Sequence, residues 1–264
     1  MSLLTEQLDA RGVLQLTLNR PKLHNAFDSD LIGSLTEALA RAEDNRDVRV
    51  VVLSGAGDSF SAGADLNWMR GMAEASEQEN EQDALQLARL MRALNYLDQP
   101  TVARVNGSAF GGGVGLVACC DIAIAADDAH FGLTESTLGL APAVIAPYVA
   151  RCIGEHQARR YFLTGERFSA RQALQIGLLH EVVPAEQLDE AVETMVTTLL
   201  RTGPVAVRTC KRLAFTVVGH DRDRQRALDQ HTAKLIASLR VSAEGQEGLA
   251  AFLEKRSPEW LDQE

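Results

Sequence analysis

The sequence predicts an α/β protein whose last third is helical. Two observations support this class: strands and helices alternate twice in the first half of the chain, and helical periodicity dominates after Pro142. Because strand, helix, strand units form right-handed crossovers, we expect the first half to build a sheet with helices packed on it. From these patterns alone, the helical part could be a second domain or an oligomerisation module.

The strands are predicted from apolar patterns. Leu14, Leu16 and Leu18 alternate with polar residues, which is typical of a half-buried strand over 13–18. The segment VRVVVL at 48–53 is apolar almost throughout, which indicates a central strand. The other predicted strands are TVARV at 101–105, DIAIAA at 121–126 and a short strand-like segment at 177–184.

Apolar residues that recur at helical spacing predict the helices. Asp28 is a suitable N-cap for a helix that reaches about Asn45, and Pro100 follows a second helix over 85–97. Between them the chain turns helical near Leu66, and the acidic residues 74–83 are expected to form an exposed or mobile loop or a helix start. Later helices are expected at 143–153, 155–163, 169–176, 186–201, 204–218, 222–239 and 243–254.

Composition limits the partners of the chain. A net charge of −10 opposes general attraction to nucleic acid or anionic membranes, and no stretch approaches the roughly 18 apolar residues of a membrane span. The four cysteines and six histidines lack the spacing of metal ligands. We therefore expect a soluble, cytoplasmic protein that has no metal site and binds neither nucleic acid nor membrane.

Two glycine-rich loops are candidates for chemistry. Residues 61–65 (SAGAD) and 111–113 (GGG) each follow a strand and begin a helix, where free N–H groups point outward. Two such loops together could form an oxyanion hole that stabilises an enolate. The alternative is that the glycines only permit tight turns or close packing. The patterns GxGxxG, GxxxxGK and GxSxG are absent.

Glu135 is the candidate acid or base. It lies among apolar residues in HFGLTESTLGLAP, where desolvation is expected to raise its pKa towards neutrality. The alternative is a solvated loop glutamate or a helix-cap partner. His24 and His130 flank the candidate loops and are expected to be structural.

Five segments together resemble the enoyl-CoA hydratase/isomerase (crotonase) superfamily over nearly the whole chain. They are NRPKLHNAF, SFSAGADLNWM, NGSAFGGGVGLVACCDIAIAADDAHFGLTE, LTGERFSARQALQIGLLHEVVP and AFLEKRSPEW. The resemblance implies a crotonase-like spiral of strand-strand-helix repeats over residues 1–190. It also implies a helical oligomerisation region over 191–264 that builds homotrimers, often paired into homohexamers.

The resemblance also implies an acyl-CoA site. The backbone N–H groups of Ala64 and Gly112 match the family's oxyanion hole for the thioester carbonyl, and Glu135 matches the glutamate that moves the proton. Coenzyme A is part of the substrate, so no separate cofactor is expected. The positions that match the coenzyme A site are Lys22, Ala26, Ala62, Asp65, Leu66, Phe252 and Lys255.

Two departures from the family pattern bear on the reaction. Common hydratases carry a second glutamate where this chain has Gly115, and PAVIAPYV at 142–149 replaces a glycine-rich run. Together with GADLNWM, these features are similar to bacterial methylglutaconyl-CoA hydratases of leucine and isoprenoid degradation.

The resulting hypothesis is a hydro-lyase that adds water to an enoyl-CoA, with a branched or carboxylated substrate such as 3-methylglutaconyl-CoA. A side chain from residues 66–90, or Thr134 or Ser136, could assist Glu135, and Arg70 or Arg89 could bind a second carboxylate. One alternative is a Δ3,Δ2-enoyl-CoA isomerase, for which a single base is sufficient. A second alternative is a non-catalytic CoA-binding or scaffold protein.

Overall fold

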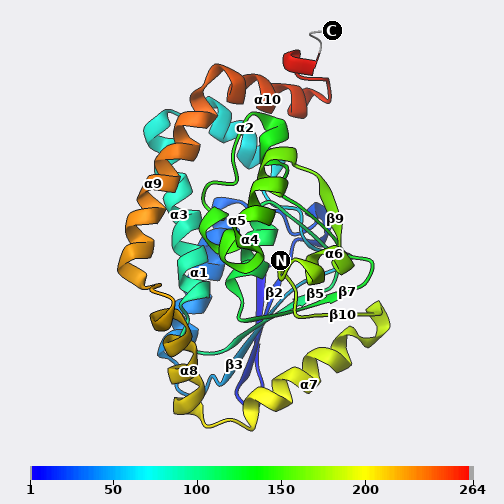
Figure 1. The fold of residues 1–264 in the computed structure, drawn as a ribbon, viewed down its shortest axis with the longest axis vertical. Coiled ribbons are helices and arrows are strands. Elements are labelled where there is room, and N and C mark those ends of the chain that lie inside the picture. Colours follow the sequence, from blue (N-terminus) through cyan, green and yellow to red (C-terminus); the bar gives the residue numbers. More distant parts are fainter. Residues whose placement is uncertain (1, 262–264) are drawn as a thin grey trace.

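A six-stranded sheet forms the centre of the computed structural model, which describes residues 2–261 (Figure 1). The strand order is β1-β2-β3-β5-β7-β10; β1 is antiparallel to β2, and the other neighbours are parallel. The α/β class is therefore confirmed. The strands are β1 (Leu4–Leu8), β2 (Val13–Leu18), β3 (Val50–Gly55), β5 (Thr101–Val105), β7 (Ile122–Ala126) and β10 (Glu181–Val183).

A second sheet of three-residue strands lies beside the first. Its order is β4-β6-β8-β9, with β4, β6 and β8 parallel and β9 antiparallel to β8. β4, β6 and β8 each follow a strand of the main sheet, so the chain repeats a strand-strand-helix unit. The sequence did not predict these strands, because three residues are too few for an alternating pattern. They are β4 (Ser59–Ser61), β6 (Ser108–Phe110), β8 (His130–Gly132) and β9 (Arg167–Ser169).

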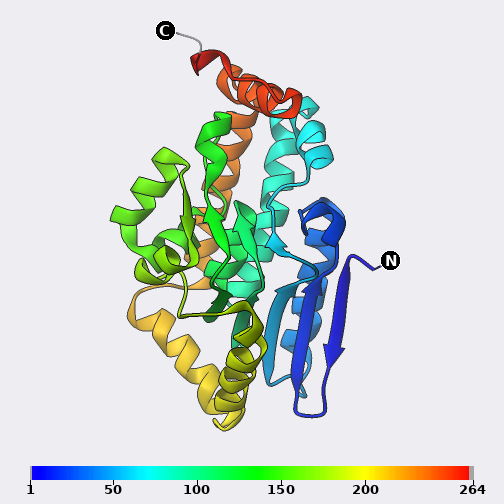
Figure 2. The ribbon, with the colours of Figure 1, turned by 90° about the vertical axis from the view of Figure 1, so that its right-hand side faces the viewer.

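Helices surround the two sheets. Figures 1 and 2 show α9 running beside α3, and α10 lying across one end of the molecule near α2. The α-helices are α1 (Ser29–Asp44), α2 (Leu66–Glu74), α3 (Glu77–Asn95), α4 (Gly112–Cys119), α5 (Ala146–Thr164), α6 (Ala170–Gln175), α7 (Leu188–Leu200), α8 (Pro204–Val217), α9 (Arg222–Val241) and α10 (Ala243–Glu254). The 3-10 helices are η1 (Pro21–Leu23), η2 (Thr134–Leu138), η3 (Ala185–Gln187) and η4 (Glu259–Leu261).

The helices predicted between 186 and 254 are confirmed to within two residues at each end. Three further points compare with the sequence prediction. Strand β1 was missed because four of its five residues are exposed at the sheet edge. The acidic stretch is a helix start, one of the two alternatives, because Ser76 and Glu79 form a capping box there, so α3 begins at Glu77 rather than at residue 85. The helices expected at 143–153 and 155–163 form one helix with a kink at Gly154.

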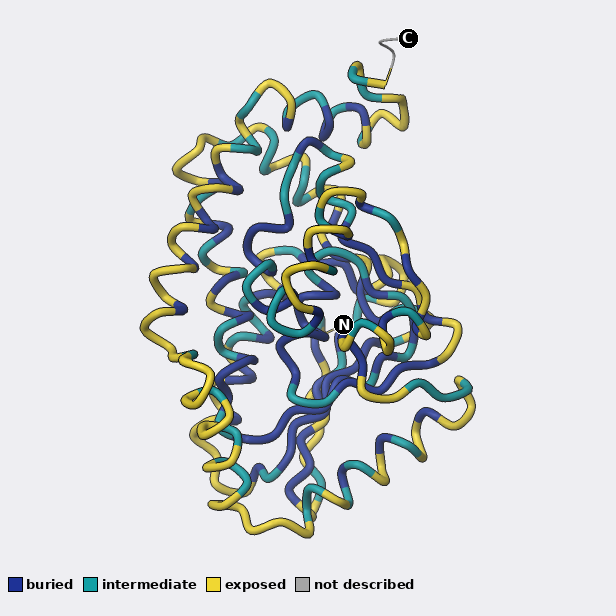
Figure 3. The backbone as a smooth tube through the Cα atoms, in the orientation of Figure 1, coloured by how far each residue is buried: buried dark blue, intermediate teal, exposed yellow. Residues whose placement is uncertain are grey.

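Both faces of the main sheet are covered, which explains the apolar strand β3. Val51 and Leu53 face the larger core with α1, α3, α4 and α5, whereas Val50 and Val52 face α7. Figure 3 shows this burial along the strands, while the outer turns of α8 and α9 are exposed. Strands buried on both faces read as continuous apolar runs rather than alternating ones.

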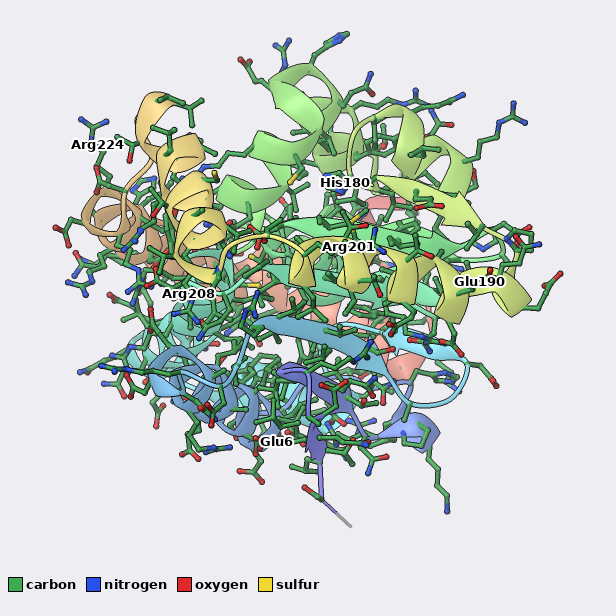
Figure 4. The ribbon with its side chains drawn as sticks, turned by 90° about the horizontal axis from the view of Figure 1, so that it is seen from below. Glu6, His180, Glu190, Arg201, Arg208 and Arg224 are labelled. Atoms are coloured by element: carbon green, nitrogen blue, oxygen red, sulfur yellow. The ribbon has the colours of Figure 1, made fainter. Side chains whose placement is uncertain are left out.

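Polar contacts hold α8 at the lower end of the sheet. Arg208 Nη2 donates to the Val48 carbonyl oxygen at 3.0 Å, and Lys211 Nζ lies 2.7 Å from the Asp121 carboxylate. Figure 4 views this end and shows Arg208 near the sheet, whereas Glu190 and Arg224 lie at the periphery. Among residues 2–261, no helix combines the length and apolar character that a membrane crossing requires. The division at residue 190 stays a prediction.

The kink at Gly154 gives a test of the fold. Gly154 has φ +73° and no heavy atom within 4 Å of the position a Cβ would take, so Gly154→Ala adds strain without a clash. Because ψ is +155° at this φ, the backbone lies in a region that essentially only glycine occupies, so we expect the free energy of unfolding to fall by about 1–3 kcal/mol in urea titrations. The matched control is Gly33→Ala in α1, also in open space but with helical φ, which should gain about 0.5–1 kcal/mol. Equal effects of the two changes would contradict this account.

Candidate active site

A cavity of about 530 Å³ lies among η1, the loops after β4 and β6, and η2 with the segment that follows it, with α9 and α10 also contributing. This volume is within the range of about 300–1,000 Å³ typical of small-molecule sites. The wall is mostly apolar, and its ionisable residues come from distant parts of the sequence. They are Lys22, His24, Asp65, Arg70, Glu135 and Arg240.

The second sheet brings the candidate residues together. In the ladder, Ser61 of β4 pairs with Ala109 of β6, and Phe110 of β6 pairs with Gly132 of β8. Because the three strands are parallel, the loops that follow them emerge at the same edge of the sheet. These loops carry Ala64, Gly112 and Glu135. The two glycine loops therefore converge, which is the condition that an oxyanion hole built from both would require.

Close backbone contact requires glycine in both loops. A Cβ on Gly63, which has φ +84°, would lie 2.8 Å from the Phe110 carbonyl oxygen and 3.7 Å from the Gly112 nitrogen. A Cβ on Gly113 would lie 2.6 Å from the Ser61 carbonyl oxygen. The glycines thus permit close packing, and that packing places the two loops side by side.

Two backbone N–H groups remain available to a ligand. Phe27 N donates to the Gly63 carbonyl oxygen at 2.6 Å, and Asp65 N donates to the Phe27 carbonyl oxygen at 2.8 Å. This bridge uses the Gly63 carbonyl oxygen and the Asp65 N–H group, on either side of Ala64, but not the Ala64 N–H group. Within residues 2–261, neither Ala64 N–H nor Gly112 N–H, at the start of α4, has an acceptor. Such a pair suits a developing oxyanion.

Glu135 lies beside this amide pair. It is on η2, two residues after β8, and its Oε1 is 3.0 Å from the position a Cβ on Gly111 would take. Its Oε2 is buried and has no hydrogen-bond partner among the described residues. Burial raises the pKa of Glu135 to about 7. The carboxyl group can therefore both accept and donate a proton near neutral pH.

Helix α10 holds the turn that carries Glu135. Gly139 ends η2 with φ +66°, and a Cβ there would lie 2.6 Å from the Glu244 carbonyl oxygen of α10. A Cβ on Gly248 of α10 would overlap the Leu138 carbonyl group. Glycines on both sides thus let the two backbones touch. The position of Glu135 depends on a helix more than 100 residues later in the chain.

Arg20 is a site residue that sequence reasoning missed. Its guanidinium forms ion pairs with Asp28 at 2.9 Å and Asp65 at 3.0 Å, and Nη1 donates to the Ala26 carbonyl oxygen. Asp28 and Asp65 cap α1 and α2, so one buried cation joins both helix starts to the loop of Ala64. Arg20 precedes Pro21 in the turn NRPKLHNAF, but its partner Asp65 is 45 positions away, so no local pattern identified it.

The residues assigned to coenzyme A by resemblance mostly line the cavity. The six that do are Lys22, Ala26, Ala62, Asp65, Leu66 and Phe252. Lys255 ends α10 outside this lining, and Asp65 is engaged as a helix cap and in the Arg20 pair. Their contacts with coenzyme A stay predictions.

Of the residues suggested to assist Glu135 or to bind a second carboxylate, some line the cavity and others do not. Thr134 and Arg70 line the cavity. Ser136 lies outside the lining, with a buried hydroxyl that has no partner in the described part of the chain. Arg89 is exposed on α3 outside the lining.

The place of the missing carboxylate is filled by apolar side chains. A Cβ on Gly115 would overlap the Ile145 side chain and would lie 3.2 Å from Met91 Cε. Ile145 also lines the cavity, so it stands between Gly115 and the ligand space. The two departures from the family pattern, Gly115 and the segment PAVIAPYV at 142–149, are therefore one structural feature. Ile145 of that segment occupies the space beside Gly115.

Comparisons with known proteins agree with this geometry. A family model described as Enoyl-CoA hydratase/isomerase matches residues 9–263. The chain belongs to this family. It is 33% identical to a crotonyl-CoA hydratase from Syntrophomonas wolfei over 248 residues, which covers 93% of each chain.

Solved structures show the same fold. An enoyl-CoA hydratase from Shewanella pealeana is 43% identical with a TM-score of 0.80, over 98% of this chain and 96% of that one. An enoyl-CoA hydratase from Mycobacterium avium is 36% identical with a TM-score of 0.86, over 98% and 99%. The predicted crotonase fold is therefore confirmed, and the repeating strand-strand-helix unit is its spiral.

Removal of Arg20 tests its role in holding the loop of Ala64. In Arg20→Met, Asp28 and Asp65 lose a largely buried partner, and we expect the free energy of unfolding to fall by about 3–5 kcal/mol. The control is Arg41→Met, which removes an exposed pair with Glu6 and should cost less than about 1 kcal/mol. Urea unfolding of both variants measures the difference, and similar losses would contradict the role.

The raised pKa of Glu135 gives a pH test of stability. Between the usual glutamate pKa and about 7, the folded chain keeps a proton at Glu135 that the unfolded chain releases, so stability falls as pH rises. Glu135→Gln removes this loss and should gain about 3 kcal/mol relative to wild type between pH 4.5 and pH 7.5. Urea unfolding across this range measures the gain. Glu190→Gln, on the surface of α7, is the control, and a gain independent of pH would contradict the assignment.

Proposed function

We propose that this protein is a hydro-lyase that adds water across the 2,3 double bond of an enoyl-CoA thioester. The observation that carries the proposal is the buried, unpaired Glu135 carboxyl group beside the free N–H groups of Ala64 and Gly112 in one cavity. Family membership and the crotonyl-CoA hydratase among the relatives support it. Coenzyme A enters as part of the substrate.

The amide pair activates the double bond. When the thioester oxygen accepts hydrogen bonds from Ala64 N–H and Gly112 N–H, electron density moves towards that oxygen and C3 becomes electrophilic. The negative charge that develops when water attacks C3 then lies on the enolate oxygen, which accepts hydrogen bonds from the same two donors. Because backbone amides need no reorganisation, they stabilise this charge as it forms.

One carboxyl group completes the proton transfer. Glu135, as a carboxylate, accepts a proton from the water whose oxygen bonds to C3, and the enolate forms. The protonated Glu135 then gives that proton to C2, which restores the thioester and the starting carboxylate. A pKa of about 7 suits both steps, because a group that must accept and then donate works best near the ambient pH.

For the substrate, we infer a branched or carboxylated enoyl chain such as 3-methylglutaconyl-CoA, as in leucine degradation. Similarity of GADLNWM and PAVIAPYV to methylglutaconyl-CoA hydratases supports this choice. The wall of the cavity also supports it, since Val144 and Ile145 of that second segment line the ligand space.

Isomerisation is the second candidate function, and the filled space beside Gly115 favours it. A Δ3,Δ2-enoyl-CoA isomerase removes a proton from C2 and returns it at C4, so one carboxylate is sufficient. With Ile145 and Met91 against Gly115, no second acid can extend from that position. The same Glu135 and amide pair would serve this reaction.

For assembly, we infer a homotrimer or homohexamer. Exposed apolar side chains on the late helices support it, because an unpaired apolar surface of this kind is typical of interfaces. They include Val205, Leu213 and Val217 on α8 and Leu228 and Leu235 on α9. A cytoplasmic location stays a prediction from composition.

An assay with two substrates separates the candidate functions. Purified protein is given a 2-enoyl-CoA and, separately, a 3-enoyl-CoA, and products are separated by chromatography. Hydration predicts loss of enoyl absorbance and a 3-hydroxyacyl product from the 2-enoyl ester. Conversion of the 3-enoyl ester to the 2-enoyl ester, without any hydroxyacyl product, would replace the hydratase by the isomerase.

Glu135→Gln tests the mechanism and the non-catalytic alternative. The amide keeps the size of the side chain but cannot take a proton, so turnover should fall by at least about 1,000-fold. Calorimetric binding of a saturated acyl-CoA should change by less than about threefold, because the oxyanion donors remain. Glu155→Gln, exposed on α5, is the control. Unchanged turnover in Glu135→Gln would remove this residue from the mechanism, and no turnover in wild type would support a binding protein.

A further inference from the structure

Arg240 is a largely buried cation in an apolar part of the cavity wall. It lies near the end of α9, its side chain is 14% exposed, and it lines the cavity one helical turn after Ile236. Ile236, Val144 and Leu87 belong to an apolar cluster that joins α3, α9 and the segment after η2, and all three line the same cavity. A guanidinium is costly to bury there unless it has partners.

Protein groups satisfy only one side of this guanidinium. Nη1 donates to Asn80 Oδ1 at 3.2 Å and to Asp83 Oδ2 at 3.1 Å. The other oxygen of Asp83 accepts from Trp68 Nε1 at 3.0 Å, and the Trp68 ring lies 5.9 Å from the Arg240 guanidinium carbon. Asp83 thus orients the arginine through Nη1, and the Trp68 ring lies beside the guanidinium.

The other edge of Arg240 has no acceptor among the described residues. Within residues 2–261, no hydrogen bond involves its Nε or Nη2. These two nitrogens form the fork that binds a carboxylate through two parallel hydrogen bonds. An oriented arginine with this edge unpaired, in the wall of a cavity, is suited to an anionic group on the ligand.

We propose that Arg240 binds a carboxylate at the far end of the acyl chain, so that the preferred substrate is the CoA thioester of a dicarboxylic enoyl acid. This proposal rests on the proposed function, and it adds the residue that recognises the carboxylate of the substrate. The apolar neighbours Leu87, Val144 and Ile236 suit the carbon chain that leads to the carboxylate. The phosphates of coenzyme A are better matched by Lys22 and Arg70, which line the cavity and are exposed to solvent.

The alternative role of Arg240 is purely structural. Through Asp83, Asn80 and Trp68 it joins α9 to α3 and α2, so its loss could loosen α2 without affecting recognition of a carboxylate. A structural role changes all substrates alike. A recognition role changes only substrates that carry the carboxylate, so a matched pair of substrates separates the two.

The test compares glutaconyl-CoA with trans-2-pentenoyl-CoA, which have the same chain length and differ only in a terminal carboxylate or methyl group. Wild type should prefer glutaconyl-CoA in kcat/KM. In Arg240→Gln, kcat/KM for glutaconyl-CoA should fall by about 100-fold, whereas that for pentenoyl-CoA should change by less than about threefold. Arg240→Lys keeps the charge without the fork and should lose part of the preference.

Two further variants serve as comparisons. Arg89→Gln is the control, because Arg89 is exposed on α3 outside the cavity lining, and it should change neither substrate. Arg70→Gln is the competing assignment. Loss of the preference in Arg70→Gln but not in Arg240→Gln would overturn the proposal. Parallel losses for both substrates in Arg240→Gln and Arg240→Lys would also overturn it.

A binding experiment keeps the inference separate from the proposed reaction. Calorimetry with the saturated pair glutaryl-CoA and pentanoyl-CoA needs no turnover, so it applies to a hydratase, an isomerase or a binding protein. We expect tighter binding of glutaryl-CoA in wild type and loss of that difference in Arg240→Gln. Equal affinities in wild type would overturn the role of Arg240, and hydration of pentenoyl-CoA would still support the proposed function.

Discussion

The parallel pairing of β4, β6 and β8 is the constraint on which the candidate active site depends. Each strand has only three residues, yet the ladder fixes where the following loop begins. Ala64, Gly112 and Glu135 lie on these three loops, so main-chain hydrogen bonds set their relative positions. A site built in this way needs few specific side chains, but it needs glycine wherever two backbones touch, as at Gly63 and Gly113.

Two acidic side chains in the same cavity wall, Asp65 and Glu135, have opposite surroundings. Asp65 is neutralised by Arg20 and accepts two backbone N–H groups at the start of α2. Glu135 has a buried oxygen without a partner in the described part of the chain, and its pKa rises to about 7. An ion pair with hydrogen bonds holds a loop in place, whereas an unpaired carboxyl group keeps its proton exchangeable. Burying Glu135 without a partner is energetically unfavourable, and the rest of the fold compensates for it. Helix α10 takes part, because it contacts η2 through Gly139 and Gly248.

Gly115 shows how the cavity differs from one built around two carboxylates. Ile145 and Met91 pack against it, so an apolar surface faces the ligand space where an acid could have stood. In the proposed reaction, water activation then depends on Glu135, and the apolar wall continues to Val144 and Ile236. Arg240 lies along this wall, and among residues 2–261 its Nε and Nη2 have no partner, whereas both Nη atoms of Arg20 are paired with carboxylates.

The sequence alone determined the α/β class, the late helices, the two glycine loops and Glu135, because each depends on local periodicity or on a charge among apolar neighbours. Only the tertiary structure decided the rest. The short strands of the second sheet carry no pattern of their own, and the exposed edge strand β1 is formed by its pairing with β2. No local pattern encodes the contacts of three further residues, because their partners are distant in the sequence. Arg20 pairs with Asp65, 45 positions away, and Arg240 pairs with Asp83, 157 positions away. Ile145 packs against Gly115, 30 positions away. Burial and pairing are properties of the packed chain, so they decided which of the candidate charges is paired and which is buried without a partner among the described residues.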